Sequence, residues 1–353
     1  MAPRPGVCQD GAVAEHEPFA VVVVTRNHAQ TLPACLAAVE ALVPPPGRVV
    51  LVDNASTDGS TEIAASWSPP LAVEVLVEDE NTGFAAAANR GIAACSEPWV
   101  LLLNPDCAPR SDFVRRLFEG LAGRSERERV AALTGRLSRA TIPDLGPQAI
   151  LDAAGMMVTC SGRHFDRGAG EADAGAFATF AWVFGGTGAA TLFRREALVD
   201  VAYPGDEVFA SSFFAYREDA ELAWRLQWRS WRCLYVPTAR AAHARGFRPE
   251  AGRRGHDEIN RHSVRNRFLL RLHCADLGWH LRCFPWWLLR DLVVFVACLT
   301  VEHASLPALA DVWRLRGEAR RRRAWVMARR TASSRRVGRW FRRRGRVEEI
   351  EKR

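Results

Sequence analysis

The stretch WVLLLNPD, residues 99–106, contains the two features on which the assignment of the fold depends. Its apolar part, residues 99–103, is typical of a strand that is buried on both faces. The strand is followed by Asn104-Pro105-Asp106, which places a carboxamide and a carboxylate two residues apart. Two interpretations are open: these residues form a turn, or they bind a ligand at the carboxyl end of a strand, as in open α/β sheets.

Three similar apolar runs precede this stretch, and segments with helical spacing follow the runs. The runs are FAVVVVT (19–25), RVVLVDN (48–54) and LAVEVLVED (71–79). Helical segments are expected at 30–42, 57–67, 83–95 and 110–121. Continuous apolar strands that alternate with helices are typical of parallel sheets covered on both faces. The sequence therefore predicts an α/β fold with a doubly wound, mostly parallel sheet.

The second half of the chain is less regular. Residues 130–215 are rich in glycine, and we expect mixed strands and loops there. A helix is then expected at 218–228, a strand at 231–237 and a helix at 257–274. From residue 277 onward the spacing predicts a helical tail that is rich in Trp and Arg.

The positive charge of the chain is concentrated at its carboxyl end. The formal net charge is +8, and residues 311–353 hold 17 Lys and Arg against 5 Asp and Glu. That segment therefore carries +12, which leaves −4 for residues 1–310. A basic tail binds nucleic acid or an anionic membrane surface, or is simply solvated. Because no recognition motif accompanies the arginines, we expect no nucleic-acid partner.

The segment GWHLRCFPWWLLRDLVVFVACL, residues 278–299, is apolar, aromatic and flanked by arginine. Such a helix lies well in a membrane interface, where anionic lipid adds to the attraction. The alternative is a helical subdomain that packs on the rest of the protein and buries Trp286 and Trp287. Both interpretations can hold for different parts of the tail, and we expect contact with a membrane surface.

Three observations predict the location of the protein. The nine cysteines form no CxxC pair, which favours reduced thiols in a cytoplasmic protein. Residues 1–18 lack the basic-then-apolar order of a signal peptide and read as a disordered leader. The longest uncharged apolar run lies within residues 292–301, about half of the ~20 residues that a spanning helix needs. We expect a cytoplasmic protein, peripheral on the inner face of the cell membrane.

Polar residues and one glycine follow the four predicted strands. They are Thr25, Arg26 and Asn27 after the first strand, Asp53 and Asn54 after the second, Asn81 and Gly83 after the third, and Asn104 and Asp106 after the fourth. Because the carboxyl ends of parallel strands meet at one edge, we expect these residues to converge. Each of them alone is equally typical of a turn or a helix cap. Neither a GxGxxG nor a GxxxxGK[ST] motif is present, so a dinucleotide site and a P-loop are not supported.

Several segments of the chain together resemble glycosyltransferase family 2. VVVVTRNHAQTLPACLAAV, VVLVDNASTDGS, NTGFAAAANRGI and VLLLNPD occur in the order and spacing of that family. GGTGAATLFRREAL (185–198) and FFAYREDAELAWRLQWRSWRCLYVPTARAAH (213–243) continue the resemblance, which covers about residues 19–275. The rhamnosyltransferase-like and galactofuranosyltransferase-like branch is the most similar. The resemblance implies a GT-A fold and transfer from a nucleoside-diphosphate sugar with inversion at the anomeric carbon.

The same resemblance implies roles for the residues at the strand ends. Asp53 matches the residue that reads the base. Asn104 and Asp106 stand at the DxD motif of the family, with Asn104 bonding the ribose and Asp106 holding Mg²⁺ or Mn²⁺. A hard cation with oxygen ligands neutralises the charge that develops on the diphosphate leaving group. The full predicted nucleotide-sugar set is Thr25, Arg26, Asn27, Asp53, Asn54, Asn81, Gly83, Asn89, Asn104 and Asp106.

Further residues are implied for the metal and for the chemistry. His243 matches a histidine that often completes the metal site, although it is equally typical of an ordinary loop. Asp219 matches the catalytic base, which takes the proton of the acceptor hydroxyl; the alternative is an acid in the first turn of a helix. We expect Glu221 to pair with Arg225 one turn on. The loop expected to contact the acceptor or the donor sugar contains Gly186, Thr187 and Glu218.

The sequence thus predicts a metal-dependent, inverting glycosyltransferase. The expected domains are a leader at 1–18, a GT-A domain at 19–275 and a membrane-associating tail at 276–353. The GT-A domain divides into a nucleotide-sugar half, 19–125, and an acceptor half, 126–275. The expected partners are dTDP-rhamnose or a UDP-sugar as donor and a lipid-linked or cell-surface polysaccharide as acceptor. The open alternatives are a catalytically silent membrane-bound scaffold of the same fold and a nucleotidyltransferase.

Overall fold

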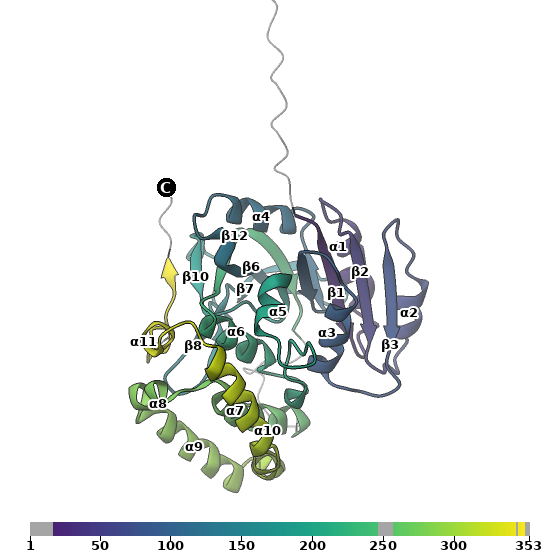
Figure 1. Cartoon of the computed structure of the whole chain (residues 1–353). Coiled ribbons are helices and arrows are strands. Elements are labelled where there is room, and N and C mark those ends of the chain that lie inside the picture. Colours follow the sequence, from purple (N-terminus) through teal and green to yellow (C-terminus); the bar gives the residue numbers. More distant parts are fainter. Residues whose placement is uncertain (1–16, 246–256, 344, 350–353) are drawn as a thin grey trace, which may run out of the picture.

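The computed structural model describes residues 17–245, 257–343 and 345–349. Apart from Glu17 and Pro18, the predicted leader lies outside the described residues. Within them the chain forms an eleven-stranded sheet and a separate two-stranded sheet of β8 (Met156–Val158) and β9 (His164–Asp166), with helices around both (Figure 1). The large sheet consists of β1 (Phe19–Thr25), β2 (Arg48–Asp53), β3 (Val73–Val77), β4 (Trp99–Leu103), β5 (Cys107–Pro109), β6 (Val130–Ala140), β7 (Pro147–Ala153), β10 (Ala181–Val183), β11 (Ala190–Arg194), β12 (Arg232–His243) and β13 (Glu348–Glu349).

The first four strands form the parallel half of the sheet. β1 pairs in parallel with β2 and with β4, and β2 pairs in parallel with β3. This arrangement confirms the predicted parallel sheet. β4 ends at Leu103, so the polar residues Asn104 and Asp106 lie beyond the strand, at the carboxyl edge.

Both faces of the parallel half are covered by helices. Val21 and Val23 of β1 pack into one core with α1, α2 and α4, whereas Val22 and Val24 pack into a second core with α3 and α5. Because both faces are buried, the strand reads as an unbroken apolar run and not as an alternation. The helices of this part are α1 (Leu32–Glu40), α2 (Ser60–Ser66), α3 (Phe84–Ala93), α4 (Phe113–Ala122), α5 (Arg195–Val201) and α6 (Glu218–Trp228), with short 3₁₀ turns η1 (Arg127–Arg129) and η2 (Ser211–Phe213).

The other half of the sheet is mixed, as expected. β11 lies antiparallel between β4 and β6, and β12 runs parallel to β6. The strand predicted at 231–237 continues to His243, which corrects the interpretation of His243 as a loop residue. The register shifts between Val236 and Arg240, around Pro237, so the strand passes the proline through an irregularity.

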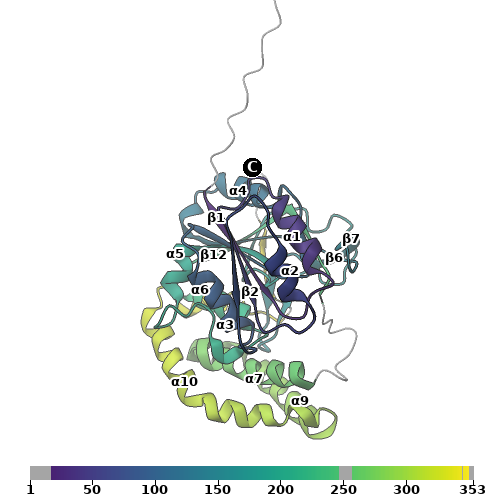
Figure 2. The ribbon, with the colours of Figure 1, turned by 90° about the vertical axis from the view of Figure 1, so that its right-hand side faces the viewer.

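The carboxyl-terminal region is helical, and it also returns to the sheet. Its elements are α7 (Asp257–Cys274), α8 (Leu277–Cys283), α9 (Trp286–Thr300), η4 (His303–Ser305), α10 (Pro307–Arg329) and α11 (Ser334–Gly338). α7 has the predicted bounds, and it lies with α9 and α10 at one end of the molecule (Figures 1 and 2). Trp340 and Phe341 are buried in the main core, and β13 pairs with β10.

The length of the described helices bears on membrane insertion. No single helix among the described residues is both long and apolar enough to cross a bilayer. α8 and α9 together reach that length and composition, but the chain bends by 80° between them.

Candidate functional site

Thr25 and Asp53 end two neighbouring parallel strands in register, and both are buried. Oδ2 of Asp53 accepts hydrogen bonds from the backbone N–H of Ser56 (3.1 Å) and from the hydroxyl of Thr61 (2.8 Å). Oδ1 of Asp53 and the hydroxyl of Thr25 are buried and have no hydrogen-bond partner among the described residues. Since buried polar atoms nearly always have a partner, these two atoms are available to a ligand.

Asn27 joins the loop after β1 to the loop after β2. Its Oδ1 accepts a hydrogen bond from the backbone N–H of Thr57 at 2.8 Å, and its own N–H donates to Oγ of Ser56 at 3.0 Å. Asn27 has a φ of 57°, a conformation that Asn adopts more readily than most residues. Arg26 is exposed beside it. The two loops therefore form one connected rim next to Asp53.

Asn54 and Asn81 hold the loop after β3 against the end of β2. Nδ2 of Asn54 donates to Oδ1 of Asn81 at 3.0 Å, and Oδ1 of Asn54 accepts from the N–H of Thr82 at 2.9 Å. Gly83 has a φ of +82°, and a Cβ at this position would lie 2.5 Å from the ring of Phe214. The three predicted residues therefore shape the edge of the sheet beside Asp53 and bring Phe214 close to it.

Asn89 lies on α3 and has another set of contacts. Its Nδ2 donates to the carbonyl of Phe209 at 2.8 Å, and its Oδ1 accepts from the N–H of Phe209 at 2.7 Å. Both polar ends of the side chain thus bind backbone, so in this structure Asn89 anchors the segment before η2.

The Asn104–Asp106 segment is a turn and also places a carboxylate at the edge of the sheet. The N–H of Cys107 donates to the carbonyl of Asn104 at 3.1 Å, which closes the turn. Asp106 is only 6% exposed, and its Oδ1 lies 3.2 Å from Nε2 of His243. The pairing of β5 with β12, which sets Cys107 opposite His243, brings the two side chains together.

His243 bridges two carboxylates, because its Nδ1 also lies 2.7 Å from Oδ2 of Asp152 on β7. Burial alone would lower the pKa of His243, but Asp106 and Asp152 raise it to about 9. Burial would raise the pKa of Asp106, but His243 holds it at about 2. The neighbouring ring of His28 also favours the ionised form of Asp106. The attraction between opposite charges therefore outweighs desolvation in this cluster.

The cluster continues toward α6 through residues that the sequence did not single out. Nη2 of Arg245 donates to Oδ2 of Asp152 at 3.1 Å and to Oδ2 of Asp166 at 2.5 Å. The negative charge of Asp166 in turn helps to raise the pKa of Asp219. Alternating charges thus connect Asp106 with Asp219.

Asp219 lies in the first turn of α6, and its Oδ1 accepts a hydrogen bond from the N–H of Ala220 at 2.7 Å. Burial, together with the charge of Asp166, raises the pKa of Asp219 to about 6. Burial and the charge of Asp219 raise the pKa of Glu218 to about 8. Oε2 of Glu218 is buried and has no hydrogen-bond partner within the described part of the chain. A carboxylate with a raised pKa is suited to accept a proton near neutral pH.

The predicted pair of Glu221 and Arg225 is present and is buried. Oε2 of Glu221 accepts from Nε of Arg225 at 2.9 Å, and Oε1 accepts from the hydroxyl of Tyr203 at 2.5 Å. Glu221 is 0% exposed and Arg225 is 1% exposed. The pair therefore fixes α6, and with it the position of Asp219.

The glycine loop between β10 and β11 lies against α6. A Cβ on Gly188 would lie 3.6 Å from Oδ2 of Asp219, and a Cβ on Gly186 would overlap the side chain of Thr191. Thr187 is buried, and its carbonyl accepts from the hydroxyl of Thr191 at 2.7 Å. The backbone of the loop therefore lies close to the carboxylate of Asp219, and at Gly188 no side chain separates the two.

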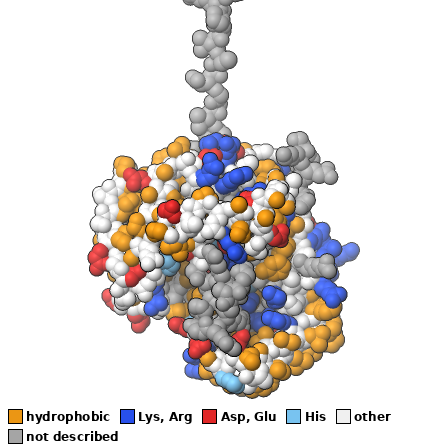
Figure 3. All heavy atoms as spheres, turned by 180° about the vertical axis from the view of Figure 1, so that it is seen from behind, with side chains coloured by type: hydrophobic (Ala, Val, Ile, Leu, Met, Phe, Trp, Pro, Cys, Tyr) orange, Lys and Arg blue, Asp and Glu red, His pale blue; other side chains and the backbone are white. Residues whose placement is uncertain are grey.

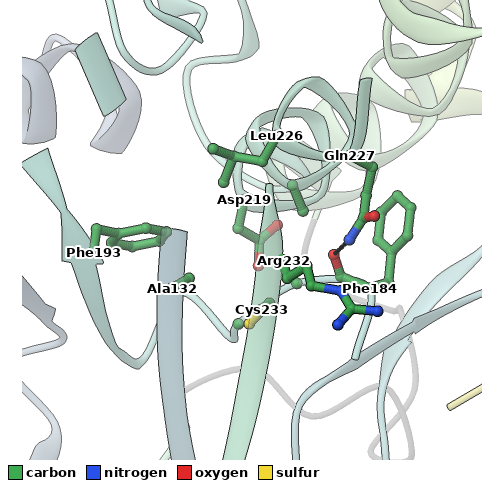
Figure 4. Close-up of a pocket in the computed structure, with 11 residues that line it drawn as sticks. Ala132, Phe184, Phe193, Asp219, Leu226, Gln227, Arg232 and Cys233 are labelled. Atoms are coloured by element: carbon green, nitrogen blue, oxygen red, sulfur yellow. Dashed lines mark hydrogen bonds between the residues drawn. The ribbon is translucent and has the colours of Figure 1, made fainter. Parts of the chain in front are cut away.

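A small cavity lies behind this loop (Figure 4). Gln227 closes one side of it by donating to the carbonyl of Phe184 at 2.9 Å. Its volume of about 10 Å³ is room for about one water molecule. It is therefore too small to be the site of a sugar. Its lining includes Ala132, Phe193, Asp219, Leu226 and Cys233.

Asp106 and His243 offer donor atoms that fit a divalent cation once Nε2 of His243 has released its proton, which metal binding to histidine requires. An oxygen and an imidazole nitrogen face each other, and a second carboxylate, Asp152, holds the outer nitrogen of the ring. Outer carboxylates orient metal-binding histidines in the same way. The described residues contain no group of three or more His, Cys, Asp or Glu side chains arranged to hold a metal ion. Further ligands would have to come from a substrate or from water.

Comparisons with known proteins agree on one family. The sequence profile of Glycosyl transferase family 2 matches residues 20–201. Glycosyltransferase AglE of Haloferax volcanii is 36% identical over 110 residues, which are 30% of this chain and 36% of that protein. Pre-mycofactocin glycosyltransferase of Mycobacterium tuberculosis is 29% identical over 231 residues, 65% of this chain and 43% of that protein. The matches span less than half the length of these relatives.

Solved structures share the fold. GalNAc-T7 with UDP, GalNAc and Mn²⁺ superposes with a TM-score of 0.56 at 13% identity, over 86% of this chain and 56% of that one. TarS 1–349 of S. aureus in complex with UDP-GlcNAc superposes with a TM-score of 0.51 at 15% identity, over 88% and 89% of the two chains. At such low identity the likeness concerns the fold alone, and it supports the GT-A architecture.

Proposed function

The chain belongs to glycosyltransferase family 2, and on this basis we propose that it transfers a sugar from a nucleoside-diphosphate sugar to an acceptor hydroxyl, with inversion at the anomeric carbon. The observation that carries the proposal is Oδ1 of Asp53, which is buried at the edge of the parallel sheet and has no hydrogen-bond partner among the described residues. In open α/β sheets ligands bind beyond the carboxyl ends of the strands. Asp53 and Thr25 would bind the nucleoside there, with the loop of Arg26 and Asn27 as one wall.

The chemistry follows from Asp219. In this proposal the carboxylate of Asp219 accepts the proton of the acceptor hydroxyl while that oxygen forms a bond to the anomeric carbon. The bond between this carbon and the diphosphate oxygen breaks at the same time, and its electron pair leaves with the diphosphate. The raised pKa of Asp219 supports the role, because a stronger base takes the proton more readily. Glu218, whose Oε2 is buried and unpartnered among the described residues, would bond a hydroxyl of the acceptor or of the donor sugar.

The diphosphate would lie next to Asp106 and His243. These two residues would hold Mg²⁺ or Mn²⁺, which when bound neutralises the charge of the leaving group. Asn104 lies at the same turn and would bond the ribose. GalNAc-T7, which shares the fold, has been solved with UDP and Mn²⁺, and this supports a divalent cation in the proposed reaction.

For the substrates, we favour dTDP-rhamnose or a UDP-sugar as donor and a lipid-linked or cell-surface polysaccharide precursor as acceptor. The curated relatives, each described as a glycosyltransferase, support sugar transfer in general. The exposed apolar residues of the carboxyl-terminal helices support an acceptor that is held at a lipid surface. We propose that the enzyme is a peripheral protein on the cytoplasmic face of the cell membrane.

The test is release of nucleoside diphosphate from a panel of dTDP-, UDP- and GDP-sugars, with Mg²⁺, Mn²⁺ or EDTA. Slow release from one donor, lost in EDTA, is the expected result, and it identifies the nucleotide before the acceptor is known. Because some transferases release the diphosphate only when an acceptor is bound, the melting temperature is measured with each donor as well. If no donor shifts the melting temperature and none is cleaved, the proposal is overturned in favour of a silent scaffold.

A further inference from the structure

The outward face of α9 is apolar along the whole helix. Two neighbouring rows of side chains, spaced by three or four residues, point away from the protein and are about half exposed. They are Leu288 (37%), Leu289 (50%), Leu292 (53%), Val293 (56%), Phe295 (47%), Val296 (54%) and Leu299 (49%). A helix on the surface of a globular protein normally turns its polar residues to water.

The inward face of α9 carries an acid that binds α7. Oδ1 of Asp291 lies 3.2 Å from Nε of Arg267, and its Oδ2 lies 2.5 Å from Nη2 of Arg271. Both arginines are buried, at 3% and 8% exposed. Cys298 and Val294 of α9 pack with Val264 of α7 on the same side. α9 is therefore fixed to α7 by its charged side chain Asp291, and its apolar side chains face outward. A helix that faces water has the opposite arrangement.

The apolar surface continues beyond α9. On α8, Leu277 and Leu281 are 70% and 71% exposed, and Phe284 between the two helices is 57% exposed. Figure 3 shows hydrophobic side chains gathered along this end of the molecule, with Lys and Arg side chains beside them. Apolar patches of this extent on a protein surface mark an interaction site.

Arginine and tryptophan border the patch. Arg282 is exposed on α8. The guanidinium of Arg343 lies 4.6 Å from the ring of Trp286 at the start of α9. Tryptophan prefers the headgroup level of a bilayer, and arginine binds phosphate. An apolar face with such a border is complementary to an anionic lipid surface, whereas a second copy of this chain would bring the same positive border against itself.

We propose that the outward face of α8 and α9 lies in the interface of an anionic lipid bilayer, with Arg282 and Arg343 at the lipid phosphates. The helices lie along the membrane and do not cross it, because Asp291 ties the middle of α9 to two buried arginines of α7. This inference rests on the proposed function, because the surface is the place where the enzyme would reach an acceptor held in lipid. Its test is independent of catalysis.

α7 also connects this surface with the catalytic region. Nδ2 of Asn266 lies within hydrogen-bonding distance of the carbonyls of Phe213 (2.8 Å), Ala215 (2.8 Å) and Tyr216 (2.7 Å). These residues lead directly into α6 and Asp219. The same helix thus binds α9 through Arg267 and Arg271 and the segment before the base through Asn266. Contact with lipid would therefore fix the orientation of Asp219 relative to the membrane.

The experiment is flotation of the full chain with vesicles of phosphatidylcholine alone and of phosphatidylcholine with phosphatidylglycerol. We expect binding that is stronger with phosphatidylglycerol. The double variant Leu292→Glu/Val296→Glu should lose roughly tenfold or more in partitioning, because two charges enter the apolar face. Val199→Glu, which changes an exposed apolar residue of α5 (62% exposed), is the matched control and should bind like the wild type.

Two further measurements distinguish a loss of lipid binding from misfolding of the variant. The double variant should keep the wild-type melting temperature, since both positions are on the surface. Leu292→Cys labelled with an environment-sensitive dye should shift to the blue with anionic vesicles, whereas Val199→Cys should not; the described cysteines are all buried. Unchanged binding of the double variant overturns the proposal. So does a dimer in light scattering that this variant dissociates, because it assigns the face to a second copy. If the protein binds the vesicles but releases no nucleoside diphosphate from any donor, the membrane-binding surface is still supported and only the proposed activity is contradicted.

Discussion

Nε2 of His243 lies 3.2 Å from Oδ1 of Asp106, so the last residue of β12 faces the turn that follows β4. The two residues are far apart in the sequence, and the short strand β5 brings them together by pairing with the end of β12. The contact marks the place where a negatively charged leaving group would be neutralised in the proposed reaction.

Asp106→Asn should weaken metal-dependent donor binding by roughly tenfold or more, because it removes the only carboxylate of the turn while keeping its shape. Calorimetric titration of the nucleoside diphosphate, with and without Mn²⁺, measures the effect. Asp79→Asn, at an exposed position, is the control. If Asp106→Asn shows the same requirement for Mn²⁺ as the wild type, Asp106 is not a ligand.

Asp219→Asn should reduce transfer by roughly 100-fold to 10,000-fold, which is the usual contribution of a general base. The amide keeps the size of the side chain but cannot take the proton of the acceptor. The melting temperature should not fall, because the raised pKa shows that the ionised carboxylate is held at a cost. A variant that keeps the full rate would assign the base to another group.

The rate should rise with pH through about 6, since Asp219 acts only when it is ionised. Asp166→Asn should move this acidic limb to lower pH. Burial is the larger cause of the raised pKa, but the negative charge of Asp166 adds to it, and its removal makes the carboxylate of Asp219 easier to ionise. The measurement is the rate as a function of pH for the wild type and for Asp166→Asn. A limb that moves to higher pH in the variant contradicts the assignment of Asp219 as the base.

Asn266→Ala should lower kcat by roughly tenfold while KM for the donor changes little, as expected when a catalytic group is misplaced. Asn266 holds carbonyls of a segment in which Phe214, Tyr216 and Arg217 all have positive φ. Without these bonds the segment relaxes, and Asp219 moves with it. Glu258→Ala, on the exposed side of α7, is the control. A change confined to KM would place Asn266 with the donor and not with the base.

Much of the fold could be predicted because its signals are local. β1, β2 and β4 are unbroken apolar runs, and α7 has the predicted bounds. The sequence predicts an earlier end for β12 because Pro237 is typical of a strand end and the polar residues Thr238 and Arg240 follow it. The strand continues because its register shifts at the proline and its alanines remain buried.

Position along the chain alone singles out the candidate residues that follow strands, whereas Asp219 and His243 are singled out only by the family resemblance. Thr25, Asp53 and Asp106 are candidates by this rule, and the structure places them at or just beyond the ends of β1, β2 and β4. Asp152 and Asp166 are not candidates by this rule, because each lies in an ordinary strand and acquires its role from partners distant in the sequence. No local pattern marks a carboxylate that acts through a histidine 91 positions away.

The double attachment of α7 has a consequence for how the enzyme meets its acceptor. If the acceptor is held in lipid, as proposed, and one side of the helix is tied to a lipid-facing element and the other to the segment before the proposed base, the search for the acceptor takes place in two dimensions. Turnover then follows the mole fraction of acceptor in the surface and not its concentration in the volume of the solution. Adding inert lipid at constant total acceptor would slow such an enzyme, although no inhibitor has been introduced.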